Sequence, residues 1–200
     1  FYVNAENVTT TTASVTWQAS AVALANGSSY YLSTSNEIPT NATTPTGTVA
    51  DGQLVNLTNL NPETMYYIWI RNNCETNVFS SWSSIYHFKT DCEAIANFNE
   101  NFDTVETPEL PACWNKILRG GENLSSYASI ESSNWQSQSA PNSIRMDTDQ
   151  SDVTFADVIL VSPNLSTLSL GTYRLKFFAK GNGSLQVGTL NVNDASAVFT

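Results

Sequence analysis

The sequence predicts an all-β chain that folds as two β-sandwiches in tandem. Short apolar runs with alternating side chains recur along its 200 residues, and clusters of turn residues separate them. No window of about 11 residues shows the apolar stripe of an amphipathic helix. Charged residues make up only 13% of the chain. Thr, Ser and Asn take their place, and these residues favour strands and turns.

Residues 1–91 are expected to form the first domain, a small Greek-key sandwich of about seven strands. Val15 and Trp17 alternate with polar residues, so both would lie on one face of their strand. The longest apolar strand is expected at residues 65–74. We expect strands at 14–19, 30–35, 53–60, 65–74 and 84–90.

The stretch LNPETMYY, residues 60–67, predicts a tyrosine corner. Leu60 can close the bottom of the core, and Pro62 ends the preceding strand because it has no N–H to donate. Tyr66 would begin the next strand and return its hydroxyl to the backbone of the corner. Such a hydrogen bond contributes about 0.5–1.5 kcal/mol to stability.

With other residues of this half, the corner resembles a fibronectin type III domain. The resemblance covers residues 1–91. No Arg-Gly-Asp tripeptide is present, so integrin binding is not implied. The motifs that carry the resemblance are Val15-x-Trp17, Leu60-x-Pro62-x-Thr64-x-Tyr66, and Trp82 with Phe88-x-Thr90.

Residues 92–200 are expected to form a second all-β domain with longer strands and loops, which suits a jelly roll. Gly171, Gly181 and Gly183 would mark turns between its strands. The expected strands are 143–147, 155–163, 172–180, 184–190 and 197–200.

This half resembles the MAM-like jelly roll, also called the choice-of-anchor or cleaved-adhesin type, of bacterial proteins that use type IX secretion. Members of that family are longer, so we expect the last strands to be missing and the domain to be incomplete at its C-terminus. Trp114 would have a structural role. The motifs are Phe98-x-x-x-Phe102-Asp103, Leu110-Pro111-x-Cys113-Trp114, Leu160-Val161-Ser162-Pro163 and Leu185-x-Val187-Gly188.

The three cysteines, Cys74, Cys92 and Cys113, match no zinc-binding spacing. The MAM-like resemblance implies a disulfide between Cys92 and Cys113, and two unpaired thiols are the alternative. We expect Cys74 to be a small buried hydrophobic residue.

The same resemblance implies one structural Ca²⁺, with Glu100, Asp103 and Asp157 at the matching positions. The acidic run MDTDQSD, residues 146–152, is expected to be a solvated loop. A calcium site there is the alternative, although the run lacks the glycine and the distal glutamate of an EF-hand loop.

Trp135 is the aromatic residue most suited to ligand contact, because it lies in the polar stretch NWQSQSAPNS, residues 134–143. Loop aromatics at the tip of a sandwich are plausible contact residues. The alternative is a ring that folds back onto the sheet.

The composition excludes several functions. The net charge is −10, and the Lys/Arg stripe that a nucleic-acid groove needs is missing. No apolar run approaches the length of about 18 residues that inserts into a membrane. The single histidine, His87, lies on a strand beside Phe88 and would face solvent, so no catalytic triad is expected.

We therefore expect no enzyme activity. The expected role is adhesion, spacing and ligand presentation on a bacterial cell surface, as part of a longer secreted polypeptide. Its partners would be other domains of that polypeptide and an extracellular protein or glycan. The alternative is a carbohydrate-binding accessory region of a secreted hydrolase, either a glycosidase or a peptidase. An exposed Trp135 with polar neighbours would favour glycan binding.

Overall fold

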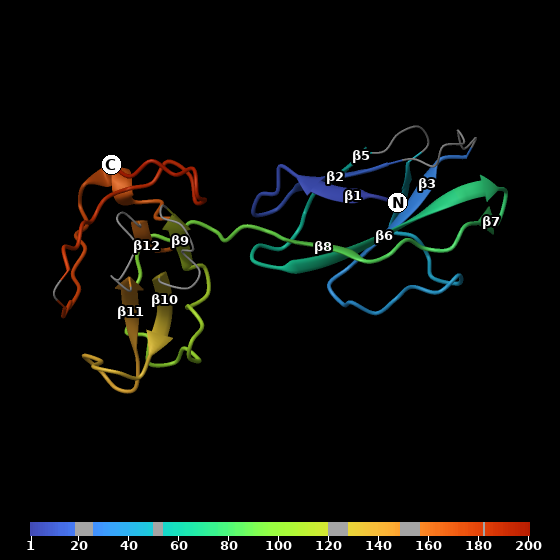
Figure 1. Cartoon of the computed structure of the whole chain (residues 1–200). Helices are drawn as coiled ribbons and strands as arrows, with labels where there is room; N and C mark the ends of the chain where they lie inside the picture. The colour runs from blue at the N-terminus through green and yellow to red at the C-terminus, as the bar shows by residue number, and fades with distance from the viewer. Residues whose placement is uncertain (19–25, 50–53, 120–127, 149–156, 182) are drawn as a thin grey trace. The chain divides into compact units, whose positions relative to one another are not determined.

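The structure is a computed structural model whose described residues form an all-β protein (Figure 1). The chain divides into two compact units, Phe1–Glu93 and Ala94–Thr200, and this boundary lies two residues after the one expected. Asp149 and Asp152 of the acidic run lie outside the described residues. The described residues are 1–18, 26–49, 54–119, 128–148, 157–181 and 183–200.

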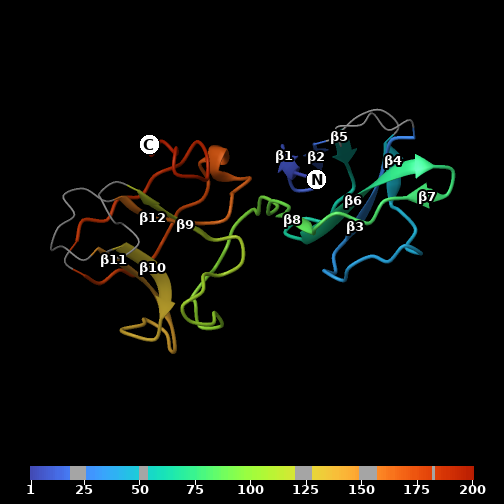
Figure 2. The same cartoon turned by 45° about the vertical axis from the view of Figure 1, so that its right-hand side comes forward.

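The first unit is a sandwich of two antiparallel sheets, which Figures 1 and 2 show as separate layers. One sheet has the order β1-β2-β5. In the other, β4, β3 and β6 are neighbours in that order, and β7 and β8 also pair with β6. The strands are β1 (Val3–Glu6), β2 (Ala13–Trp17), β3 (Ser28–Ser33), β4 (Gly47–Val49), β5 (Leu54–Leu57), β6 (Met65–Glu75), β7 (Val78–Phe79) and β8 (Tyr86–Lys89).

Strand alternation places the core of this unit between the two sheets. Ala13, Val15 and Trp17 of β2 are buried, while Ser14 and Thr16, which alternate with them, are only partly buried. Ile68 and Ile70 of β6 are fully buried and belong to the same cluster. Burying one such side chain contributes about 1.5–3 kcal/mol. The cluster consists of Ala13, Val15, Trp17, Leu57, Leu60, Tyr66, Ile68, Ile70 and Phe88.

The tyrosine corner lies between β5 and β6. The Asn61 N–H donates to the Tyr66 hydroxyl at 2.9 Å, and the Tyr66 ring stacks on Phe88. The Thr90 hydroxyl donates to the Asn61 carbonyl at 2.7 Å and accepts from the Thr64 N–H at 2.9 Å. Pro62, which is half-buried, lies within this corner. The side chains of Tyr66, on β6, and of Thr90, directly after β8, therefore hold the turn that begins at Leu60.

Trp69 is buried although it points away from the core, because other aromatic rings cover it. Its ring lies 5.8 Å from that of Tyr31 and 6.5 Å from that of Tyr67. The row continues to Trp82, 6.3 Å from Tyr31, and to His87, 6.2 Å from Tyr67. His87 itself is exposed. The outer face of this sheet thus carries a second layer of packing.

Arg71 ends this aromatic row as a buried cation. Its guanidinium carbon lies 4.0 Å from the centre of the Phe79 ring and 4.4 Å from that of Trp82. Its Nη1 donates to the carbonyl of Asn41 at 3.3 Å, and Trp82 Nε1 donates to the carbonyl of Thr40 at 3.0 Å. Burial lowers the pKa of Arg71. These contacts fasten the β3–β4 connection over the sheet.

Cys74 is exposed and free, so the prediction that it would be buried is wrong. It lies on the same side of β6 as Ile68 and Ile70, but the strand extends beyond the core there. The pairing of β6 with β7 is also irregular between Asn73 and Glu75. A core-facing position at this end of the strand therefore reaches solvent.

The described residues of the second unit form two antiparallel strand pairs. Its strands are β9 (Asn115–Arg119), β10 (Ala128–Ser133), β11 (Ser143–Thr148) and β12 (Asp157–Val161). β10 pairs with β11, β12 pairs with β9, and β12 also contacts β10 and β11. Ile117 and Ile130 are buried between these elements. Lys116 Nζ donates to the Ile130 carbonyl at 3.1 Å and so links one pair to the other.

Trp114 forms a small aromatic cluster at the start of β9. The rings of Phe98 and Phe102 meet it edge-on at 5.3 Å and 5.4 Å. Cys92 and Cys113 form a disulfide, as predicted. It closes the segment that carries the two phenylalanines, and it places Cys113 directly beside Trp114.

The strands expected at 172–180 and 184–190 are not present. After the short 3₁₀ helix η1 (Leu168–Leu170), the chain is irregular on both sides of residue 182 (Figure 1). A single bridge joins Leu190 to Phe199. A strand needs a neighbour for its backbone groups, and no described residue pairs with 172–180.

Replacing Tyr66 by Phe should destabilise the first unit by about 0.5–1.5 kcal/mol, because Asn61 loses its acceptor. Urea unfolding followed by tryptophan fluorescence measures this loss. Tyr67→Phe is the matched control, since its hydroxyl has no hydrogen bond to any residue of the described chain. Equal losses in both variants would show that the corner hydrogen bond does not contribute.

Candidate functional site

Trp135 lies in the β10–β11 connection with its side chain in solvent. It is 64% exposed, and its sequence neighbours Asn134 and Gln136 are exposed polar residues. Its N–H donates to Ser133 Oγ at 3.3 Å, and its carbonyl accepts from Ser143 Oγ at 3.2 Å. These two hydrogen bonds fix the backbone of Trp135, and its ring extends into solvent.

Short-range geometry helps to expose the ring. Ser133 and Ser143 are the last paired residues of β10 and β11, so Trp135 comes immediately after the ladder ends. Gln136 has a φ of 57°, in the left-handed region that is uncommon for residues other than glycine. The chain thus turns sharply just after the tryptophan.

The base of the hairpin is tied to residues 103–106 by three side chains. Ser139 Oγ donates to Asp103 Oδ1 at 3.1 Å, and the amide nitrogen of Asn142 donates to the Val105 carbonyl at 2.7 Å. Ser132 Oγ donates to the Glu106 carbonyl at 3.3 Å. Asn142 and Ser132 are 6% and 2% exposed. An exposed aromatic ring on a fastened loop is suited to contact a ligand with little loss of loop entropy.

The three predicted calcium ligands do not come together. Among the described residues, no group that contains Glu100, Asp103 and Asp157 has its ligand atoms within 4.8 Å of one another. Glu100 Oε1 accepts from the Phe102 N–H at 2.6 Å. Asp103 is occupied by Ser139 and by Asn101, whose Nδ2 lies 2.7 Å from Oδ2. Each carboxylate thus has a partner within the protein.

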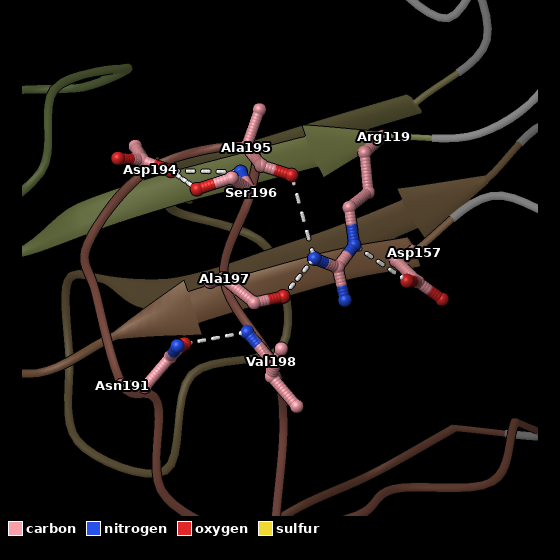
Figure 3. Close-up of polar contacts among 8 residues, drawn as sticks. All are labelled: Arg119, Asp157, Asn191, Asp194, Ala195, Ser196, Ala197 and Val198. Atoms are coloured by element: carbon pink, nitrogen blue, oxygen red, sulfur yellow. Dashed lines mark hydrogen bonds and ion pairs between the residues drawn. The ribbon is translucent and has the colours of Figure 1, made fainter.

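Asp157 instead holds Arg119, its cross-strand partner on β9 (Figure 3). Arg119 Nε lies 2.7 Å from Asp157 Oδ2. The Nη1 of the same guanidinium donates to the carbonyl oxygens of Ala195, at 3.4 Å, and Ala197. Ala197 is 2% exposed. Arg119 therefore fastens residues 195–197 onto the β9–β12 pair, which is a structural role.

Two further side chains shape this C-terminal segment (Figure 3). Asp194 Oδ1 accepts from the Ser196 hydroxyl at 2.5 Å and from the Ser196 N–H at 2.7 Å. These two hydrogen bonds lower the pKa of the Asp194 carboxyl. Asn191 Oδ1 accepts from the Val198 N–H at 2.7 Å. Sequence reasoning missed the Arg119 contacts because they depend on which distant segments meet in space. The Asp194–Ser196 contacts are local, and the pattern Asp-x-Ser could have indicated them.

No family profile and no curated protein matches the chain. Among solved structures, a computer-based redesign of a β-sandwich protein is similar, with 27% identity over 46% of this chain and 93% of that chain, and a TM-score of 0.38. This similarity carries no argument about function. No helix among the described residues is both long and apolar enough to cross a membrane.

Replacing Asp103 by Ala should loosen the hairpin, because Ser139 loses its acceptor. Hydrogen exchange at residues 134–142 should become faster, while chelation of Ca²⁺ from the unaltered chain should have no such effect. Asp147→Ala is the control, since that residue lies on β11 and pairs with Arg145. If chelation reproduced the effect of Asp103→Ala, Asp103 would be a calcium ligand.

The double variant Cys92→Ser/Cys113→Ser should destabilise the fold around Trp114 and β9 by about 3 kcal/mol, because it opens a loop of about 20 residues. A urea titration that follows exchange protection of β9 measures this change. Cys74→Ser should leave the titration unchanged, since its thiol is free. Peptide mapping without reduction checks the pairing, and a linked peptide that contains Cys74 would contradict it.

Proposed function

We propose that the chain is a non-catalytic binding region of an extracellular protein, and that the β10–β11 hairpin presents Trp135 to a carbohydrate. The observation that carries the proposal is the exposure of this ring, 64%, on a loop that side chains hold in place. A flat ring in solvent, beside amide and hydroxyl groups, is the arrangement on which a sugar ring can stack.

The rest of the molecule fits a supporting role. The tyrosine corner and the motifs of residues 1–91 support a fibronectin type III-like spacer, and those of residues 92–200 support a MAM-like module of a secreted bacterial surface protein. Both assignments rest on resemblance, and fold alone does not determine function. The proposal places adhesion or surface attachment at the hairpin and spacing in the first unit.

A second candidate is a carbohydrate-binding accessory region of a secreted glycosidase or peptidase. The same hairpin favours it, since an accessory region holds its enzyme on a polysaccharide through exposed aromatic rings. The two candidates differ in their ligand. An accessory region would bind a soluble polysaccharide substrate, whereas an adhesion module would bind glycans or proteins of a surface.

Trp135→Ala should weaken binding about fivefold, since an aromatic contact of this kind contributes on the order of 1 kcal/mol. Affinity electrophoresis in gels that contain β-glucan, xylan or mannan measures binding to polysaccharides. Adhesion of the chain to glycoprotein-coated surfaces measures the other candidate. Trp135→Phe should retain part of the binding.

Tyr2→Ala is the matched control, because Tyr2 is also an exposed aromatic residue, at 74%. Loss of binding in Trp135→Ala alone would support the hairpin as the contact site. Equal binding by all three variants, or binding of the unaltered chain in neither assay, would contradict the proposal.

A further inference from the structure

The segment TYRLKFFAK, residues 172–180, exposes large apolar side chains. Tyr173, Leu175 and Phe177 are 56%, 55% and 52% exposed, and Phe178 is 81% exposed. Single exposed apolar residues are common on protein surfaces, but four within six residues form a contiguous patch. Such patches mark interaction surfaces, because water is excluded from them when a partner binds.

The backbone of the same segment also lacks partners among the described residues. No backbone hydrogen bond joins residues 172–180 to another part of the described chain. The residues are nevertheless rich in aromatic side chains and alternate in character, as strands do. The segment therefore offers a row of N–H and C=O groups that an added strand can satisfy.

Its charge differs from that of the remaining chain. Arg174, Lys176 and Lys180 are three of the eight basic residues, and no acidic residue occurs between 158 and 193. All three are exposed, and none forms an ion pair within the described chain. The remaining five basic residues are outnumbered by 18 acidic ones. Residues 172–180 are thus a basic segment of an acidic protein.

We infer that residues 172–180 bind an extended segment of a partner polypeptide as a neighbouring strand, and that this segment alternates acidic with apolar residues. In an extended conformation, Tyr173, Leu175 and Phe177 share one face, while Arg174, Lys176 and Phe178 share the other. Apolar side chains of the partner would pack on the first face. Carboxylates would pair with the second, because cross-strand pairs of opposite charge are favourable.

Charge also argues against a second copy of this segment as the partner. Two copies paired with each other would place Arg and Lys side chains opposite one another, and like charges in such positions are unfavourable. The inference goes beyond the role proposed for Trp135, which lies in another connection of the second unit.

The test uses the whole chain and two labelled peptides of nine residues, one of alternating Val and Glu and one of alternating Val and Lys. Fluorescence anisotropy should show that the Val/Glu peptide binds about tenfold more tightly, since charge complementarity determines the preference. In Arg174→Glu/Lys176→Glu, the preference should reverse in favour of the Val/Lys peptide. Leu175→Ser/Phe177→Ser should weaken binding of the Val/Glu peptide without reversing its preference.

Lys89→Glu/Arg145→Glu is the control for net charge, because both side chains are exposed cations on other strands. It should keep the preference for the Val/Glu peptide. Circular dichroism checks that each variant retains the β-spectrum of the unaltered chain.

Three results would overturn the inference. The first is equal binding, or no binding, of the two peptides. The second is binding of phosphatidylserine vesicles with no binding of the Val/Glu peptide, which would identify a lipid surface as the partner. The third is a dimer or polymer in light scattering that Arg174→Glu/Lys176→Glu dissociates, which would identify a second copy.

Discussion

The structure depends on one constraint: the backbone of every strand needs a neighbour. Buried N–H and C=O groups must be paired, and in an all-β chain only another strand can pair a whole row of them. In the first unit, β6 meets this requirement because it pairs with β3, β7 and β8. The described part of the second unit meets it with two strand pairs. Residues 172–180 have a sequence typical of a strand, but no described residue pairs with their backbone.

Side-chain hydrogen bonds hold the connections that the sheets do not. The Tyr66 hydroxyl fixes the corner, and Arg71 fastens the β3–β4 connection. Asn142 ties the β10–β11 hairpin to residue 105, and Arg119 holds residues 195–197. Each of these hydrogen bonds fixes the backbone of a connection at the surface. The exposed ring of Trp135 is therefore presented by a rigid base, which is the physical basis of the proposed ligand contact.

The sequence predicts well those features that depend on residues near one another in the chain, such as strand faces and turns. Alternation around Trp17 identified a buried strand face, and the spacing from Leu60 to Tyr66 identified the corner. It could not predict contacts between distant segments. The calcium set failed to assemble because Asp157 has a cross-strand arginine on β9 and Asp103 has a serine from the hairpin. Alternation suggested a strand at 172–180, but it does not show whether a neighbour is present.

The second unit combines a fastened hairpin with a strand-like segment, residues 172–180, whose backbone has no partner among the described residues. The most direct test is a hydrogen-exchange time course of the unaltered chain without a ligand. The account predicts strong protection of β6 and of β10, and no protection of residues 172–180. Protection of 172–180 equal to that of β10 would contradict it, because the segment would then already be paired as a strand.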